Sequence, residues 1–233
     1  MIIELVVARY CEDLNWLRKV PPVIQKTVYD KSGEPNPAPN GILLPNNAGR
    51  EAHTYLHHII TRYDSLADWT VFCQGKPFDH AFDFHHSLRA FAANADQIGT
   101  TGLIESNSDQ FRWLGHIVDT DDNRGQRLFS TWSKNGDGRG LDLVGFHRAL
   151  FGTDGPEVYP FVLGAQFAVH RDLVQQRPPE FYERALAISV NFPDAAHCFE
   201  RSWDRVFGVT GLTNDWLAGR QTVYLKPVKK HTT

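Results

Sequence analysis

The fold is decided by residues 50–73, which read REAHTYLHHIITRYDSLADWTVFC. From Arg50 to Tyr63, apolar residues fall at offsets 0, 3, 4, 7, 8 and 11, the spacing of one helical face. Asn46, Asn47 and Gly49 supply turn and capping chemistry just before this helix. Leu66 to Cys73 is an apolar run of strand length. The stretch therefore predicts an amphipathic helix that leads into a buried strand.

The residues before this stretch predict further strands. Ile2 to Ala8 is a nearly continuous apolar run, typical of a strand buried on both faces of a parallel sheet. A short helix at 14–17 and a strand from Val23 to Tyr29 follow. This alternation predicts an α/β fold with a mostly parallel, doubly wound sheet flanked by helices. We expect one domain over residues 1–225 and a basic tail at 226–233.

The carboxyl ends of parallel strands meet at one edge of a sheet, where ligands bind. The loops at 9–13, 45–50 and 74–80 are therefore predicted to share one rim.

The second half of the chain has weaker patterns. Gly99 to Gly155 predicts long loops and short helices, because Gly, Asp and Asn punctuate residues 119–125 and 135–140. Tyr159 to Val169 predicts a strand interrupted by Gly164. Helices are expected at 171–176, 180–189 and 195–207.

Composition restricts the function classes. The net charge is −3, the pI is about 6.4, and no long basic stretch could follow a nucleic-acid backbone, so we expect no nucleic-acid partner. The odd number of cysteines without metal-ligand spacing suits a reducing compartment. No apolar run approaches the roughly 20 residues of a membrane span, and residues 2–8 lack a signal peptide's basic leader. We expect a cytoplasmic protein without a transmembrane segment.

The sequence lacks a Gly-x-Ser-x-Gly elbow, a P-loop and a Gly-x-Gly-x-x-Gly fingerprint. A serine hydrolase, an NTPase and a dinucleotide oxidoreductase are therefore disfavoured.

Two segments have metal-ligand spacing. His53 and His57 lie four apart on the predicted helix, and a further ligand would come from His80, His85 or His86. Packing beside the apolar stripe is the favoured interpretation. Residues 119–122, Asp-Thr-Asp-Asp, contain an Asp-x-Asp pair that could hold Mg²⁺ or Mn²⁺. A solvated turn is favoured here, because no strand signal precedes the pair.

Two further segments offer acid–base groups. Residues 74–80 follow a buried strand, and Asp79 and His80 supply a carboxylate and an imidazole at a helix entry. An Asp N-cap beside an incidental His explains them equally well. Glu200 and Arg201 lie on the last predicted helix, where Glu200 could be a general base for a sugar hydroxyl. A structural role, in which these residues pair with loops over the sheet, is slightly favoured.

Several segments together carry a family likeness: Val6-Val7-Ala8-Arg9-Tyr10-x-Glu12-Asp13-Leu14-x-Trp16-Leu17, residues 44–60, Gln74-Gly75-x-Pro77-Phe78-Asp79-His80, residues 164–171 and 177–182, and His197-x-x-Glu200-Arg201-x-Trp203. They resemble the uncharacterised family called domain of unknown function 3431. The likeness extends from about residue 4 to residue 208 and is weakest in the middle. The family name implies no activity.

A more distant likeness implies a function. Residues 46–51, followed by a helix and a strand, are similar to a region of GT-A glycosyltransferases that build surface polysaccharides. Residues 164–171 are similar to the stretch that lines the donor–acceptor cleft in several such enzymes. The resemblance implies transfer of a sugar from a nucleotide-sugar donor to a hydroxyl of a glycan or glycolipid acceptor.

The candidate site combines these segments with the resemblance. Glu200 and Asp79 are the candidate catalytic residues. The donor would be bound by Arg9, Tyr10, Asp13, Asn46, Gly49, Arg50, Gln74, Gly75 and Lys76. Further substrate contacts would come from His80, Gln166, Arg171 and Arg201.

One departure leaves the cofactor open. The GT-A strand that ends in an Asp-x-Asp metal site ends here in Gln74-Gly75-Lys76. Mn²⁺ or Mg²⁺ could serve, or Lys76, Arg50 or Arg171 could neutralise the leaving group without metal. Two alternatives also stay open: a non-catalytic glycan- or nucleotide-binding module, and a metal-dependent hydrolase built on His53, His57, His80 and Asp79.

Overall fold

The computed structural model describes residues 1–34, 38–93, 109–125 and 140–209, and the backbone of 223–224. The strands are β1 (Ile3–Arg9), β2 (Gln25–Asp30), β3 (Ile42–Leu43), β4 (Trp69–Gln74), β5 (Phe111–Trp113), β6 (Ile117–Asp122), β7 (Val158–Val162), β8 (Phe167–His170) and β9 (Val223–Tyr224). The α-helices are α1 (Arg50–Arg62), α2 (Phe84–Ala93), α3 (Leu143–Phe151), α4 (Arg171–Val174), α5 (Pro179–Asn191), α6 (Ala195–Glu200) and α7 (Trp203–Val206). Short 3₁₀ helices are η1 (Asn15–Lys19), η2 (Tyr63–Ser65) and η3 (Pro77–Asp79).

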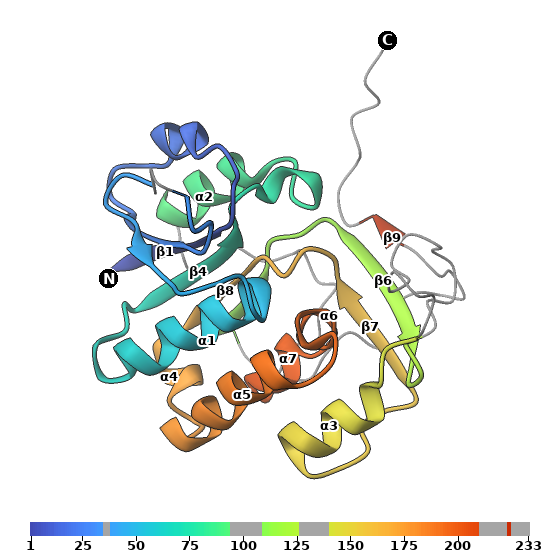
Figure 1. Ribbon diagram of the computed structural model, residues 1–233. Coiled ribbons are helices and arrows are strands. Elements are labelled where there is room, and N and C mark those ends of the chain that lie inside the picture. The colour runs from blue at the N-terminus through green and yellow to red at the C-terminus, as the bar shows by residue number, and fades with distance from the viewer. Residues whose placement is uncertain (35–37, 94–108, 126–139, 210–222, 225–233) are drawn as a thin grey trace.

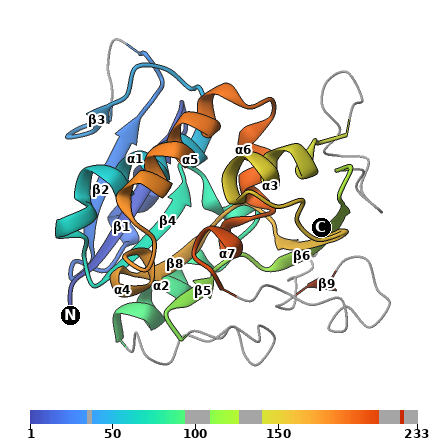
Figure 2. The same cartoon turned by 90° about the horizontal axis from the view of Figure 1, so that it is seen from below.

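Within the described residues, six strands form the larger sheet, in the order β3-β2-β1-β4-β8-β5 (Figure 2). β1 pairs in parallel with both β2 and β4, and β2 pairs in parallel with β3. β8 runs antiparallel to β4 and β5. The chain passes from β1 to β2 and β3 on one side and to β4 on the other, so the strand order reverses between β1 and β4. β6 pairs antiparallel with β7 and β9 in a smaller sheet.

Helices cover both faces of the larger sheet (Figure 1). Val6 and Ala8 of β1 pack into one apolar cluster with residues of α1, α5, α6 and α7. Leu5 and Val7 point to the other face, into a cluster with residues of α2. The continuous apolar run of β1 is thus explained by burial on both sides. The predicted α/β fold, with a mostly parallel sheet flanked by helices, is confirmed.

Three expectations for the second half of the chain are wrong. The expected loop at 119–122 belongs to β6, where Asp119 and Asp121 are buried. The expected strand from 159 to 169 is interrupted at Gly164 (φ +91°) as predicted, but its two parts, β7 and β8, are separate strands in different sheets. The expected helix over 195–207 divides into α6 and α7 at Arg201 and Ser202.

Two other expectations lie partly or wholly outside the described residues, namely the loop at 135–140 and the basic tail at 226–233. The described helices are each too short or too polar to cross a lipid bilayer.

Candidate functional site

A pocket of about 290 Å³ opens where the strand order reverses, at the carboxyl ends of β1 and β4. We call it the switch-point pocket. Its lining consists of Ala8, Arg9, Tyr10, Glu12, Lys31, Asn47, Arg50, Glu51 and Gln74. Residues from all three predicted rim loops therefore meet at one place. An open α/β sheet binds ligands in this position, because the connections diverge there and leave a crevice.

Arg9 ends β1 and forms one wall of the pocket. Its guanidinium pairs with Asp30 at 2.6 Å and with Glu34 at 2.9 Å, and it donates to the Glu12 carbonyl at 3.1 Å. Burial alone would raise the pKa of Asp30, but hydrogen bonds from the Ala38 backbone, Ser32 and Arg9 hold it below its ordinary value. The charge of Arg9 is therefore balanced by protein carboxylates, and the residue fixes the loop after β2.

Lys31 follows β2 and is 3% exposed. Its ammonium donates to the carbonyls of Ala48 at 2.6 Å and Arg50 at 3.0 Å. Burial lowers the pKa of Lys31 to about 8. The residue was missed in the sequence, because a single lysine after a strand carries no motif.

The turn that Lys31 holds is strained. Gly49 adopts φ +67° and Arg50 adopts φ +46°, a region in which side chains other than glycine are uncommon. A Cβ at Gly49 would lie 2.6 Å from the carbonyl oxygen of Ser189 on α5, so glycine is also required by packing. This turn places Arg50 at the pocket, where its exposed guanidinium makes no ion pair with a described residue.

Glu51 is a titratable carboxyl group of the pocket that the sequence analysis did not single out. Burial raises its pKa from 4.5 to about 7, and the nearby charge of Glu200 acts in the same direction. Arg50 and a hydrogen bond with Gln74 act against this rise. An acidic residue in the first turn of a helix is normally interpreted as a favourable partner of the helix dipole, so the pattern gave no reason to place Glu51 in a pocket.

Glu200 lies behind the pocket, at the end of α6. Its Oε1 accepts a hydrogen bond from the backbone N–H of Gly164 at 2.7 Å, and its Oε2 pairs with Arg201 at 2.7 Å. Burial would raise the pKa of Glu200, but the Arg201 charge, the Gly164 N–H and His197 lower it. Glu200 is therefore a carboxylate at neutral pH, and it keeps a negative charge close to Glu51.

Arg201 is a buried structural cation. It is 1% exposed, pairs with Asp121 of β6 at 2.7 Å and lies over the ring of Phe161 at 4.1 Å. It thereby joins α6 to the smaller sheet and orients Glu200.

Gln166 contacts Gln74, one of the residues that line the pocket. It is fully buried, and its Nε2 lies 3.5 Å from Oε1 of Gln74. Gly164 must lack a side chain here, because a Cβ at its φ of +91° would collide with His80 and Gln166. His80 is thus adjacent to Gly164, and a positive charge on its ring would lower the pKa of Glu200.

Several expected donor residues have other partners. Asn46 accepts a hydrogen bond from the Ala48 backbone, and Asp13 accepts one from the Asn15 backbone. Gly75 donates to the Ala8 carbonyl. Asp13 lines a neighbouring pocket of about 370 Å³ and not the switch-point pocket. Tyr10, by contrast, is exposed and lines the switch-point pocket.

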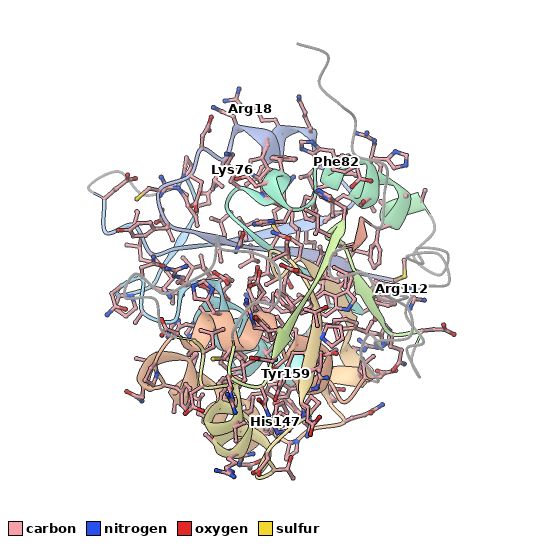
Figure 3. All side chains as sticks on the ribbon, turned by 90° about the vertical axis from the view of Figure 1, so that its right-hand side faces the viewer. Arg18, Lys76, Phe82, Arg112, His147 and Tyr159 are labelled. Atoms are coloured by element: carbon pink, nitrogen blue, oxygen red, sulfur yellow. The ribbon has the colours of Figure 1, made fainter. Side chains whose placement is uncertain are left out.

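Asp79, Lys76 and Arg171 do not line the switch-point pocket. Lys76 and Asp79 form an exposed ion pair at 3.3 Å. Figure 3 shows Lys76 in the same part of the molecule as Arg18. Arg171 pairs with Asp68 at 3.1 Å. It follows β8, which runs antiparallel to β4, so it lies at the sheet edge where β4 begins.

The expected metal-binding segments are engaged elsewhere. His53 and His57 stack with their ring centroids 6.1 Å apart, and burial lowers the pKa of His53 to about 4. His85 contacts the Trp16 carbonyl through its Nε2. No group of three or more His, Cys, Asp or Glu side chains suited to a metal ion gathers in the part of the chain that the structure describes. The solvated turn expected for the Asp-x-Asp pair is wrong, since Asp121 is buried against Arg201.

A comparison with known families identifies the N-terminal region. Residues 5–102 match the family model described as "Protein of unknown function (DUF3431)". The resemblance noted in the sequence is confirmed over these residues, which are less than half of the 233-residue chain. The DUF3431 match contains every residue that lines the switch-point pocket, whereas Gln166 and Glu200 lie beyond it. No curated protein matches the chain.

Proposed function

We propose that the chain is a GT-A-like glycosyltransferase, a single domain that transfers a sugar from a nucleotide-sugar donor to a hydroxyl of a glycan or glycolipid acceptor. The observation that supports this proposal is the composition of the switch-point pocket. Lys31, Arg50 and Glu51 all line this pocket, at the carboxyl ends of β1 and β4. Cations for a departing diphosphate and a carboxyl for the hydroxyl proton are the groups that this reaction needs.

In the proposed reaction, the acceptor hydroxyl oxygen bonds to the anomeric carbon while the bond from that carbon to the diphosphate oxygen breaks. The hydroxyl proton passes to Glu51, whose pKa of about 7 leaves a large fraction of it as carboxylate at neutral pH. Glu200 acts on this step through its charge, because it raises the proton affinity of Glu51. Asp79 has no part in it, because it is paired with Lys76 away from the pocket.

In the proposed reaction, cationic side chains of the pocket neutralise the charge of the leaving diphosphate. Of the three cations expected from the sequence, Arg50 alone lines the pocket, whereas Lys76 and Arg171 are paired with acids elsewhere. The proposal therefore assigns neutralisation of the diphosphate to Arg50, assisted by Lys31. A metal-dependent hydrolase receives no support from the arrangement of His53, His57 and His80.

The test is saturation-transfer NMR on the full chain with uridine, guanosine and cytidine diphosphate sugars, followed by product analysis with an acceptor panel. We expect nucleotide sugars of one nucleotide class to bind, and to release the nucleoside diphosphate when the sugar is transferred. Glu51→Gln should retain donor binding and lose turnover, and Asp79→Asn, in the exposed ion pair, should retain both. Absence of a response to every nucleotide sugar would refute the proposal. Binding without product would favour the non-catalytic module.

A further inference from the structure

Lys31 is a buried cation that lacks a carboxylate partner. An ammonium group carries three hydrogens, and two of them are given to the carbonyls of Ala48 and Arg50. No ion pair joins Lys31 to an acidic residue among those the structure describes. Lysine is rarely buried without a partner for its charge, because desolvation of an ammonium is costly. Within the described residues the third hydrogen has no acceptor, and Lys31 forms part of the pocket lining, so its ammonium can meet a ligand there.

The other charged groups of the pocket do not use this charge. Arg9 is balanced by Asp30 and Glu34. Glu12 accepts a hydrogen bond from the Tyr10 backbone N–H at 2.7 Å. Glu51 attracts Lys31 without forming an ion pair with it. Among the described residues that line the pocket, Lys31 and the guanidinium of Arg50 therefore remain as cations for a ligand.

These two cations belong to one rigid unit. Lys31 donates to the carbonyls on either side of Gly49, so its ammonium is fixed to the strained turn that begins α1. Arg50 extends from the same turn. Strained backbone of this kind persists where the surrounding structure holds it, and it is often found at ligand sites.

We infer that Lys31 and Arg50 form an oxyanion subsite of the switch-point pocket that binds a diphosphate group. Lys31 contributes a fixed point charge, and the guanidinium of Arg50 can contact two phosphoryl oxygens at once. A pocket of about 290 Å³ has room for a diphosphate together with part of the groups attached to it. The identity of those groups rests on the proposed glycosyltransferase function, whereas the diphosphate subsite rests on the residues themselves.

Isothermal titration calorimetry of the full chain with inorganic pyrophosphate tests the subsite. We expect one site, with affinity at least tenfold lower in Lys31→Met and in Arg50→Gln. Lys26→Met removes an equal charge from an exposed residue of β2 and should leave the affinity unchanged. Arg50 is exposed, so Arg50→Gln remains informative if Lys31→Met fails to fold.

A second readout is specific to Lys31. Because the pKa of its ammonium is about 8, an anion that pairs with it favours the protonated form. At pH 8 the wild type should take up protons on binding pyrophosphate, which is seen by comparing buffers of different ionisation enthalpy. Lys31→Met should lose most of this uptake.

The results separate the two proposals. Absence of pyrophosphate binding, or equal weakening by Lys26→Met and Lys31→Met, would overturn the subsite. Pyrophosphate binding as expected, without a response to any nucleotide sugar, would support the subsite and refute the proposed glycosyltransferase function. Sugar transfer that is unaffected by Lys31→Met and Arg50→Gln would leave the function in place and remove the subsite.

Discussion

Replacement of Glu51 by glutamine should stabilise the protein at alkaline pH, although we propose that Glu51 is essential for turnover. The wild-type carboxyl has a pKa of 4.5 in the unfolded reference and about 7 in the fold, where burial disfavours its charge. Above pH 7 the folded protein must therefore hold a partly buried charge that the unfolded chain holds in water. At about 1.4 kcal/mol per pH unit, this difference costs about 3 kcal/mol of folding stability.

The sign of the effect fixes the pH window. The folded state binds the Glu51 proton more tightly than the unfolded state, so this carboxyl costs nothing below pH 4.5. Its cost grows as the pH rises from 4.5 to about 7 and is constant above that. Glutamine is neutral at every pH and can keep the hydrogen bond with Gln74. Glu51→Gln should thus gain about 3 kcal/mol at pH 8 and less than about 1 kcal/mol at pH 5.

Urea unfolding of both proteins at pH 5, 6, 7 and 8 measures this difference. Glu183→Gln is the control for net charge, because it removes the same charge from an exposed residue of α5. It should change the free energy of unfolding by less than about 0.5 kcal/mol at each pH. A gain from Glu51→Gln that is the same at pH 5 and pH 8, or a loss at pH 8, would refute the assignment of a buried carboxyl with raised pKa.

Three further predictions concern the frame of the site. Gly49→Ala should reduce the free energy of unfolding by about 1–3 kcal/mol, and by more than Gly152→Ala does. Both glycines have positive φ, but a Cβ at Gly152 meets no atom, whereas one at Gly49 would meet α5. Thermal unfolding compares the two variants, and equal losses of stability would contradict the close packing of Gly49 on α5. Arg201→Met should cost about 3–5 kcal/mol in urea unfolding, because it leaves buried carboxylates unpaired, whereas Arg148→Met in an exposed ion pair should cost at most about 1 kcal/mol. Burial lowers the pKa of His58 from 6.5 to about 3, so the stability that this neutral group contributes is lost as the pH falls below 6.5. His58→Gln should therefore reduce the change in the urea midpoint between pH 7 and pH 4. An unchanged pH dependence would show that His58 is not held neutral in the fold.

The sequence predicted the N-terminal half of the fold well, because its patterns are local. The stripe of α1 and the apolar runs of β1 and β4 each report burial through residue spacing alone. The same patterns placed Arg9, Arg50 and Gln74 at one rim, since the ends of parallel strands must lie at one edge. These residues line the pocket.

The predictions for the second half of the chain were wrong in places, because the burial of its residues depends on partners distant in sequence. β6 reads as a polar loop, yet Asp121 is buried through its ion pair with Arg201, 80 residues later in the chain. Gly164 resembles a defect within one strand, but the turn it permits separates two sheets.

Residue periodicity was therefore enough to predict the class of fold and the edge of the sheet where the pocket opens, because it records which faces are buried. The charges that remain available there could be identified only from contacts in the folded chain. Arg9 and Lys76 have acidic partners, whereas Lys31 and Glu51 gain their unusual protonation from burial. Ion pairing and desolvation depend on distances across the fold, and a linear pattern of residues does not contain those distances.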